Sequence, residues 1–207
     1  WGNYNVYLST AMVPGVIMVF VFLLTPYSIG TELKFHRSKQ WIKMANDNIH
    51  LAVAGKMLPL TILFTLVMWC FEFYIFYGLG FPHPGGVIPI LLVGFLSVLA
   101  CQCFGIFIFG LLPSLRMSMS ICSLWSVLSF SVCGATYPVF AMDSMLQSLA
   151  QIFPLRHYYM IYQMCIFNGY PLSYAWFHIM SLAIFACLPI FTIRNIKKAM
   201  LVYVYIP

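Results

Sequence analysis

The chain has 207 residues, of which 63% are hydrophobic and only 7% are charged. Soluble domains carry about 25% charged residues, so this composition excludes a water-soluble globular protein. The net charge of +6 reports on membrane topology rather than on nucleic acid, because Lys and Arg collect on the cytoplasmic side of membrane proteins. We therefore expect an all-α polytopic membrane protein that binds no nucleic acid.

Five uncharged stretches are long enough to cross a bilayer, for which roughly 20 apolar residues suffice. Glu72 is the only acidic or basic residue inside any of them. Together they predict one transmembrane domain over residues 1–207. The predicted spans are residues 9–29, 57–81, 87–112, 117–138 and 173–193.

The positive residues fix the expected orientation. With the first residues outside, only Arg156 lies in an outer loop, and the other positive residues face inward. An N-terminus outside, starting at Trp1, leads us to expect the C-terminal part of a longer chain whose first span precedes Trp1. The inward residues are Lys34, Arg37, Lys39, Lys43, Lys56, Arg116, Arg194, Lys197 and Lys198.

Residues 31–56 are too polar to span the membrane and form the main inner segment. Phe35, Ile42, Ala45 and Ile49 recur at helical spacing, which predicts an amphipathic helix that Asn46, Asp47 and Asn48 then break. Such a helix either lies on anionic membrane lipid or docks on a cytoplasmic partner, and the residues alone leave both interpretations open.

The outer segment before the last span predicts two short helices within residues 143–168. Asp143 favours a helix start, Ser144 and Gln147 have the spacing of a capping box, and Pro154 stops the first helix. The second helix ends near Gly169. We expect both helices to enter the outer leaflet, where protein must cover their polar backbone.

No catalytic group of residues stands out, and no cofactor or metal is expected. The seven Cys lack zinc-site spacing, and no phosphate-binding glycine loop is present. His157 beside Arg156 is either an outer-surface catalyst or an interfacial anchor. Glu72, costly at membrane depth, either lies on a substrate or ion path or makes an interhelical hydrogen bond. The carboxylates are scattered over Glu32, Asp47, Glu72 and Asp143.

Two sets of residues resemble ABC-2 type transporter permeases. The inner segment is similar to the family's cytoplasmic segment between spans two and three through Glu32-Leu33-Lys34, Trp41, Ala45 and Gly55-Lys56-x-Leu58-Pro59. The outer segment is similar to the motif before the last span through Gly134-x-Thr136-Tyr137-Pro138, Ala141-Met142, Leu146-Gln147, Leu149-Ala150 and Pro154-Leu155-Arg156-His157-Tyr158. The resemblance covers nearly the whole chain and matches spans two to six of a six-span permease.

This resemblance implies a permease of a bacterial inner-membrane exporter that pairs with a second permease subunit and with cytoplasmic ABC ATPase subunits. The inner segment would be its coupling helix, although His36-Arg37 replaces the common Gly-Thr, and Asp143 replaces a Pro on the outer side. The implied ATPase-coupling residues are Glu32, Lys34, His36, Arg37, Trp41 and Lys56. The implied outer-motif residues are Gly134, Tyr137, Pro138, Met142, Pro154, His157 and Tyr158.

The resemblance does not decide whether the substrate is a drug, a lipid or a polysaccharide. It also leaves open whether a periplasmic adaptor protein takes part. Two other classes remain as alternatives. One is a membrane-embedded enzyme that acts on lipid at the outer surface. The other is an ion-coupled secondary transporter, for which internal repeats would be expected.

Overall fold

The computed structural model describes residues 4–135 and 137–202, so Trp1 and Thr136 of the outer motif lie outside the described residues. Within these ranges the chain is helical and contains no strand. The α-helices are α1 (Tyr4–Lys34), α2 (Ser38–Met44), α3 (Ile49–Phe73), α4 (Val87–Leu111), α5 (Leu115–Val132), α6 (Ser144–Ala150), α7 (Pro154–Ile161), α8 (Trp176–Cys187) and α9 (Pro189–Val202). Wider π-helical turns extend α3 over Tyr74–Gly78 and α7 over Tyr162–Phe167, and 3₁₀ turns occupy Val139–Ala141 and Leu172–Ala175.

The prediction of an all-α polytopic membrane protein with five spans is confirmed. Five helical segments of the described chain are long and apolar enough to cross a membrane. They are Ser9–Lys34, Ile49–Gly78, Val87–Leu111, Leu115–Val132 and Leu172–Val202.

Three predicted span boundaries differ from the observed helices. The second span begins at Ile49 rather than at 57, because Asn48 caps a helix there by accepting a hydrogen bond from the backbone N–H of His50 at 3.0 Å. The fourth ends at Val132 rather than at 138, because Gly134 takes a φ of +99°. The last span continues to Val202 rather than ending at 193. The reason is that α9 is amphipathic: it buries Ile196 against the bundle and leaves Arg194 exposed.

The predicted break at Asn46, Asp47 and Asn48 is present, but the amphipathic helix before it is shorter than predicted. Only Ser38–Met44 forms α2, while Phe35 precedes it and Ile49 already belongs to α3. The reason is local backbone geometry, because His36, Asn46 and Asp47 have φ of 56°, 55° and 58°. Asn and Asp tolerate this left-handed conformation better than most residues, and it ends a helix.

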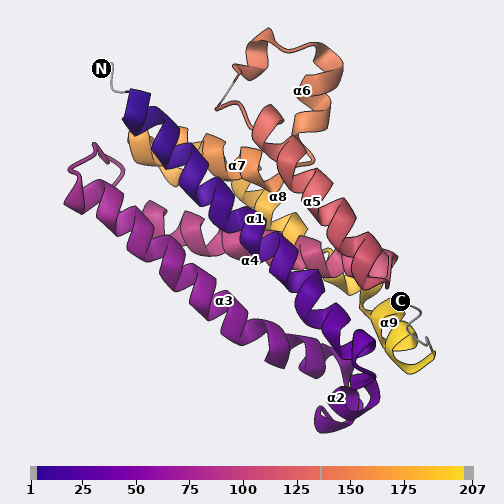
Figure 1. The fold of residues 1–207 in the computed structure, drawn as a ribbon. Coiled ribbons are helices and arrows are strands. Elements are labelled where there is room, and N and C mark those ends of the chain that lie inside the picture. The colour runs from indigo at the N-terminus through magenta and orange to yellow at the C-terminus, as the bar shows by residue number, and fades with distance from the viewer. Residues whose placement is uncertain (1–3, 136, 203–207) are drawn as a thin grey trace.

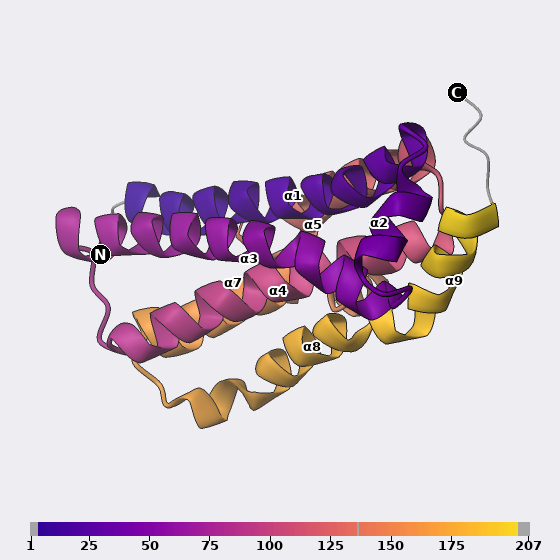
Figure 2. The same ribbon diagram turned by 90° about the horizontal axis from the view of Figure 1, so that it is seen from below.

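The helix α4 lies at the centre of the bundle. It packs against α1, α3, α5, α7, α8 and α9, while α1 and α3 run side by side across it (Figures 1 and 2). Close approach needs small residues on α4. A Cβ added at Gly105 would lie 3.1 Å from Thr25 Cβ of α1, and one at Gly110 would lie 2.5 Å from Thr192 Cβ of α9.

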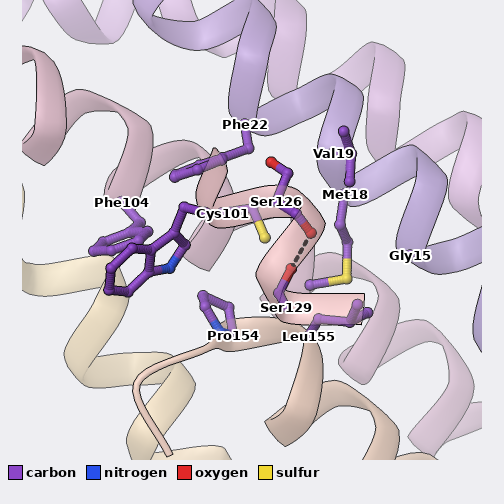
Figure 3. A pocket seen from close by; sticks show the side chains of 11 residues that line it. Gly15, Met18, Val19, Phe22, Cys101, Phe104, Ser126, Ser129, Pro154 and Leu155 are labelled. Atoms are coloured by element: carbon purple, nitrogen blue, oxygen red, sulfur yellow. Dashed lines mark hydrogen bonds between the residues drawn. The ribbon is translucent and has the colours of Figure 1, made fainter. Parts of the chain in front are cut away.

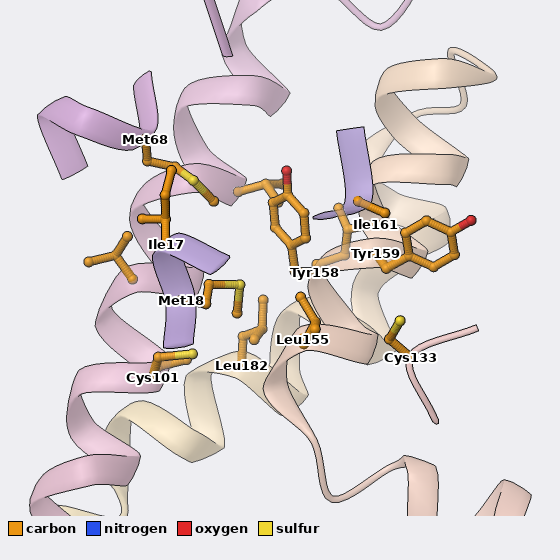
Figure 4. Close-up of a cluster of buried hydrophobic side chains, with 14 of the residues drawn as sticks. Ile17, Met18, Met68, Cys101, Cys133, Leu155, Tyr158, Tyr159, Ile161 and Leu182 are labelled. Carbon is orange, nitrogen blue, oxygen red and sulfur yellow. The ribbon is translucent and has the colours of Figure 1, made fainter. Parts of the chain in front are cut away.

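The largest buried apolar cluster lies in the half of the bundle that holds α7 (Figure 4). There Met18 of α1, Cys101 of α4, Leu155 of α7 and Leu182 of α8 converge. A second cluster joins α1, α3, α4 and α9 nearer to α2 and includes Ile42 of α2. The short helices α2 and α7 are therefore built into the packing of the long ones.

The two ends of the bundle differ in character. The α2 segment and α9 lie at one end, while α6, the α3–α4 connection and the start of α1 lie at the other (Figure 1). The charge pattern predicts that the α2 end faces the cytoplasm, and we call it the inner end and its opposite the outer end.

An added side chain should destabilise the protein more at Gly110 than at Gly55. Gly110→Ala forces α9 away from α4 and should lower the thermal unfolding midpoint in detergent, since overpacking costs about 1–3 kcal/mol. Gly55→Ala on exposed α3 surface meets no atom within 4 Å and should leave the midpoint unchanged or raise it. An equal loss in both variants would contradict this account of the α4–α9 contact.

Candidate functional site

The connection between α1 and α3, residues 35–48, forms a hairpin that we call the inner hairpin. Two hydrogen bonds fasten it to the last helix. Ser38 Oγ donates to the backbone oxygen of Met200 at 2.8 Å, and Lys197 Nζ donates to that of Asp47 at 2.7 Å. Ile42, 1% exposed, packs into the cluster that contains Ile196 of α9. The hairpin is thus held against α9 and the start of α3.

A small group of charged side chains connects the inner hairpin to the ends of α1 and α3. Lys56 Nζ donates to Glu32 Oε1, and Arg37 Nε lies 3.8 Å from Glu32 Oε2. Lys56 Nζ also lies 5.4 Å from the centroid of the Trp41 ring, within cation–π range. Four of the six residues that the sequence predicts for ATPase coupling are thereby brought together.

The remaining two predicted coupling residues lie on the exposed side. Lys34 Nζ and Arg37 Cζ lie 5.8 Å and 5.6 Å from the centroid of the Phe35 ring. His36 is exposed and adopts a left-handed backbone. Lys34 and His36 are therefore part of an exposed surface at the inner end, whereas Trp41 is half-buried inside the hairpin.

The exposed face of the inner hairpin combines positive and apolar groups. Met44 is 85% exposed and Phe35 57% exposed, beside the exposed Lys39 and Lys43. Asp47 is the only carboxylate within residues 35–48. Large exposed apolar side chains at a polar segment mark a contact surface for a protein or a membrane.

The outer motif residues mostly shape the chain between α5 and α7. Tyr137 donates through its hydroxyl to the Ala141 carbonyl at 3.3 Å, and the Met142 carbonyl accepts from Gln147 Nε2 at 2.9 Å. Asp143 is the cap of α6, as predicted, and accepts from the Met145 backbone N–H at 3.4 Å. Pro138 precedes a 3₁₀ turn, Pro154 is the first residue of α7, and Gly134 follows α5.

His157 lies inside the bundle rather than at its surface. It is 1% exposed, its Nε2 lies 2.8 Å from the Gln151 backbone oxygen, and its Nδ1 lies 2.9 Å from Nδ1 of His178 on α8. Burial lowers the pKa of His157; the hydrogen bond to Gln151 opposes this shift and the Arg156 charge adds to it. Because both ring nitrogens are engaged, His157 is poorly placed to act on lipid at the outer surface.

Glu72 and Tyr158, both predicted site residues, meet in the interior. Glu72 is 2% exposed, and the Tyr158 hydroxyl lies 3.5 Å from its Oε1. Its Oε2 has no hydrogen-bond partner among the described residues, and a Cβ at Gly94 would lie 2.8 Å from it. This contact joins α3 to α7 and favours the interhelical hydrogen bond; a role for Glu72 on a substrate path stays a prediction.

An apolar hollow opens between α1, α4, α5 and the start of α7 (Figure 3). Met18, Phe22, Phe104 and Leu155 line it (Figure 3), as does Trp125. Its two hydroxyl groups are already used, since Ser129 Oγ donates to the Ser126 carbonyl and Ser126 Oγ donates to the Cys122 carbonyl, each at 2.7 Å. Its lining is thus mainly apolar, while Trp125 Nε1 is buried without a hydrogen-bond partner among the described residues. Among residues 4–135 and 137–202, no group of His, Cys, Asp and Glu is suited to a metal ion.

Sequence reasoning misses the residues that hold these sites through hydrogen bonds, most of them to partners far away along the chain. Ser38, Lys197, Gln151 and His178 were not predicted, although their hydrogen bonds hold the inner hairpin and α7. The amphipathic pattern of α9 was a usable signal, because its inward face predicts contact with another inner element.

Together these features define a multi-pass helical membrane protein with a braced, positively charged hairpin at one end and a buried polar cluster at the other. A family model described as ABC-2 family transporter protein matches residues 2–193, and the chain belongs to this family. It is therefore a transmembrane component of an ABC transporter. The family resemblance noted in the sequence is confirmed, and no curated protein matches the chain.

The Glu32–Lys56 contact can be tested with a double-mutant cycle. Glu32→Gln and Lys56→Met should each lower the unfolding midpoint, and the double variant should lose less than their sum, with about 0.5–3 kcal/mol of coupling. Lys198→Met on exposed α9 surface is the matched control and should combine additively with Glu32→Gln. If the stability losses of Glu32→Gln and Lys56→Met were additive, the contact would contribute nothing to the stability of the fold.

Acid should loosen the contact between α7 and α8. Because the folded-state pKa of His157 lies below the ordinary value of about 6.5, the stability that its neutral ring contributes is complete above that pH. This stability is lost as the pH falls through the folded-state pKa. Hydrogen exchange of residues 154–161 should accelerate as the pH falls below about 6.5, after correction for the intrinsic rate. His157→Gln should remove most of this acceleration and the exposed His50→Gln none of it; an unchanged response in His157→Gln would refute the assignment.

Proposed function

We propose that this chain is the permease of an ABC-2 type exporter and that its inner hairpin is the surface on which a cytoplasmic ATPase subunit docks. One observation carries the proposal: a surface rich in exposed Phe35, Met44 and Lys side chains is braced from inside by Glu32, Lys56 and the last helix. Such bracing would let a movement of the hairpin reach other helices, which supports protein docking over rest on lipid.

The bracing gives the docked ATPase a way to act on the membrane part. A displacement of α2 would be passed to α9 through the Ser38–Met200 and Lys197–Asp47 hydrogen bonds. It would reach α3 through the contact between the Trp41 ring of α2 and Lys56 of α3. Both α3 and α9 pack against the central helix α4, so the movement would extend into the bundle.

The proposed transport path lies at an interface with a second permease subunit, as is common in this family, and export would use ATP hydrolysed on the partner subunit. The hollow beside Phe22 and Phe104 has a volume of about 20 Å³, far below that of a drug or lipid site, so drugs, lipids and polysaccharides all stay open as substrates. A bacterial inner membrane and a periplasmic adaptor protein belong to the same proposal.

Two exposed methionines offer a matched test of ATPase docking. A photoreactive methionine analogue is placed at Met44 of α2 or, as the control, at Met145 of α6, which is 79% exposed at the opposite end. After illumination of native membranes, mass spectrometry should identify an ABC ATPase attached at position 44 and not at position 145. Capture of lipid alone at position 44, or of the ATPase at position 145, would contradict the proposal.

A further inference from the structure

The outer end of the bundle buries a positive side chain. Arg156 of α7 is only 7% exposed, although its guanidinium stays charged at neutral pH even when burial lowers its pKa. Its neighbours along α7, Leu155 and His157, are buried too, so the side chain cannot simply extend into water.

Gln151 holds one edge of this guanidinium. With the Gln151 amide oriented so that its oxygen faces Arg156, that oxygen accepts hydrogen bonds from Nε and Nη2, both at 3.2 Å. The backbone oxygen of the same residue lies 2.8 Å from His157 Nε2. Gln151 therefore fixes Arg156 and His157 at once, but a neutral amide supplies no negative charge.

No carboxylate neutralises Arg156 among the described residues. The ion pairs found there all involve Glu32 at the inner end, while Asp143 is exposed and caps α6. The nearby Cys133 Sγ donates to the Phe130 carbonyl at 3.2 Å, and its interaction with Arg156 favours the charged guanidinium, which opposes the lowering of the Arg156 pKa by burial. A buried charge without a counter-ion is strongly unfavourable.

The third nitrogen of the guanidinium is unused. Arg156 Nη1 is buried and has no hydrogen-bond partner among the described residues. It faces Gly134, where an added Cβ would lie 3.9 Å from Nη1, and Gly134 itself is only half-buried. The same added Cβ would lie 3.0 Å from Val139 Cγ2, so an approach to Nη1 past Gly134 requires the Val139 side chain to move.

We propose that Arg156 binds an oxyanion, represented by a phosphate group, which reaches Nη1 past Gly134. A charge-assisted hydrogen bond to Nη1 would supply both the missing partner and the missing counter-charge. The phosphate group belongs either to a lipid headgroup of the outer leaflet or to a free anion. This inference goes beyond the proposed function and does not depend on ATPase docking, so its test measures binding and not transport.

The test uses the intact permease in a maltoside detergent, which carries no phosphate group. One arm titrates inorganic phosphate and follows the thermal unfolding midpoint. The other arm adds phosphatidylglycerol and counts retained phosphatidylglycerol by native mass spectrometry. Wild type should respond in at least one arm, and Arg156→Gln should weaken the response at least about tenfold. A response to phosphate identifies a free anion, and retention of phosphatidylglycerol without it identifies a lipid headgroup.

A second variant keeps the test decisive if Arg156→Gln does not fold. Gln151→Glu is nearly isosteric and places a carboxylate against Nε and Nη2, so the internal counter-ion should abolish binding while the fold is retained. Arg116→Gln, which removes one exposed positive charge at the inner end, is the control and should bind as wild type does. The proposal is overturned if wild type responds in neither arm, if Gln151→Glu binds like wild type, or if Arg116→Gln loses as much as Arg156→Gln.

Discussion

The close approach of other helices to α4 is the constraint on which the rest of the structure depends. In lipid, apolar surface gives little drive for helices to associate, so their contacts rest on close packing and on hydrogen bonds. Glycines at 105 and 110 let α1 and α9 reach the α4 surface, and Gly94 makes room for the Glu72 carboxyl of α3. Once these approaches are fixed, the inner ends of α1, α3 and α9 lie together, and the inner hairpin can be fastened between them.

Positive side chains have different partners at the two ends of the bundle. At the inner end Lys56 is shared between Glu32 and the ring of Trp41, while further positive side chains remain in contact with solvent. At the outer end the guanidinium of Arg156 is enclosed and has no carboxylate partner among the described residues, where its hydrogen bonds go to the Gln151 amide oxygen. A neutralised, braced cluster supports mechanical contact with another protein, whereas an enclosed charge without a counter-ion favours a ligand that brings one.

The helix α7 links the outer end to the interior. Its residues Arg156, His157 and Tyr158 reach Gln151, His178 and Glu72, which belong to three different parts of the chain. Each of these contacts satisfies a polar group that would be costly to bury alone. A ligand at Arg156 would therefore act on the same short helix that contacts α3 and α8, and the α8–α9 segment continues to the inner hairpin.

The five spans, the short helices α6 and α7, and the family are predictable from the sequence, because span length, turn residues and motif spacing are local properties of the chain. The break after α2 at residues 46–48 is predictable in the same way, whereas sequence reasoning missed the start of α2 beyond the left-handed His36 and one boundary of each of three spans. Only the tertiary structure decided that Glu32 meets Lys56, that Ser38 meets Met200, and that Gln151 holds Arg156 together with His157. The pair Ser38 and Met200 is separated by 162 positions, and no periodicity encodes such a pairing, which arises only when the packing around α4 brings distant helices together.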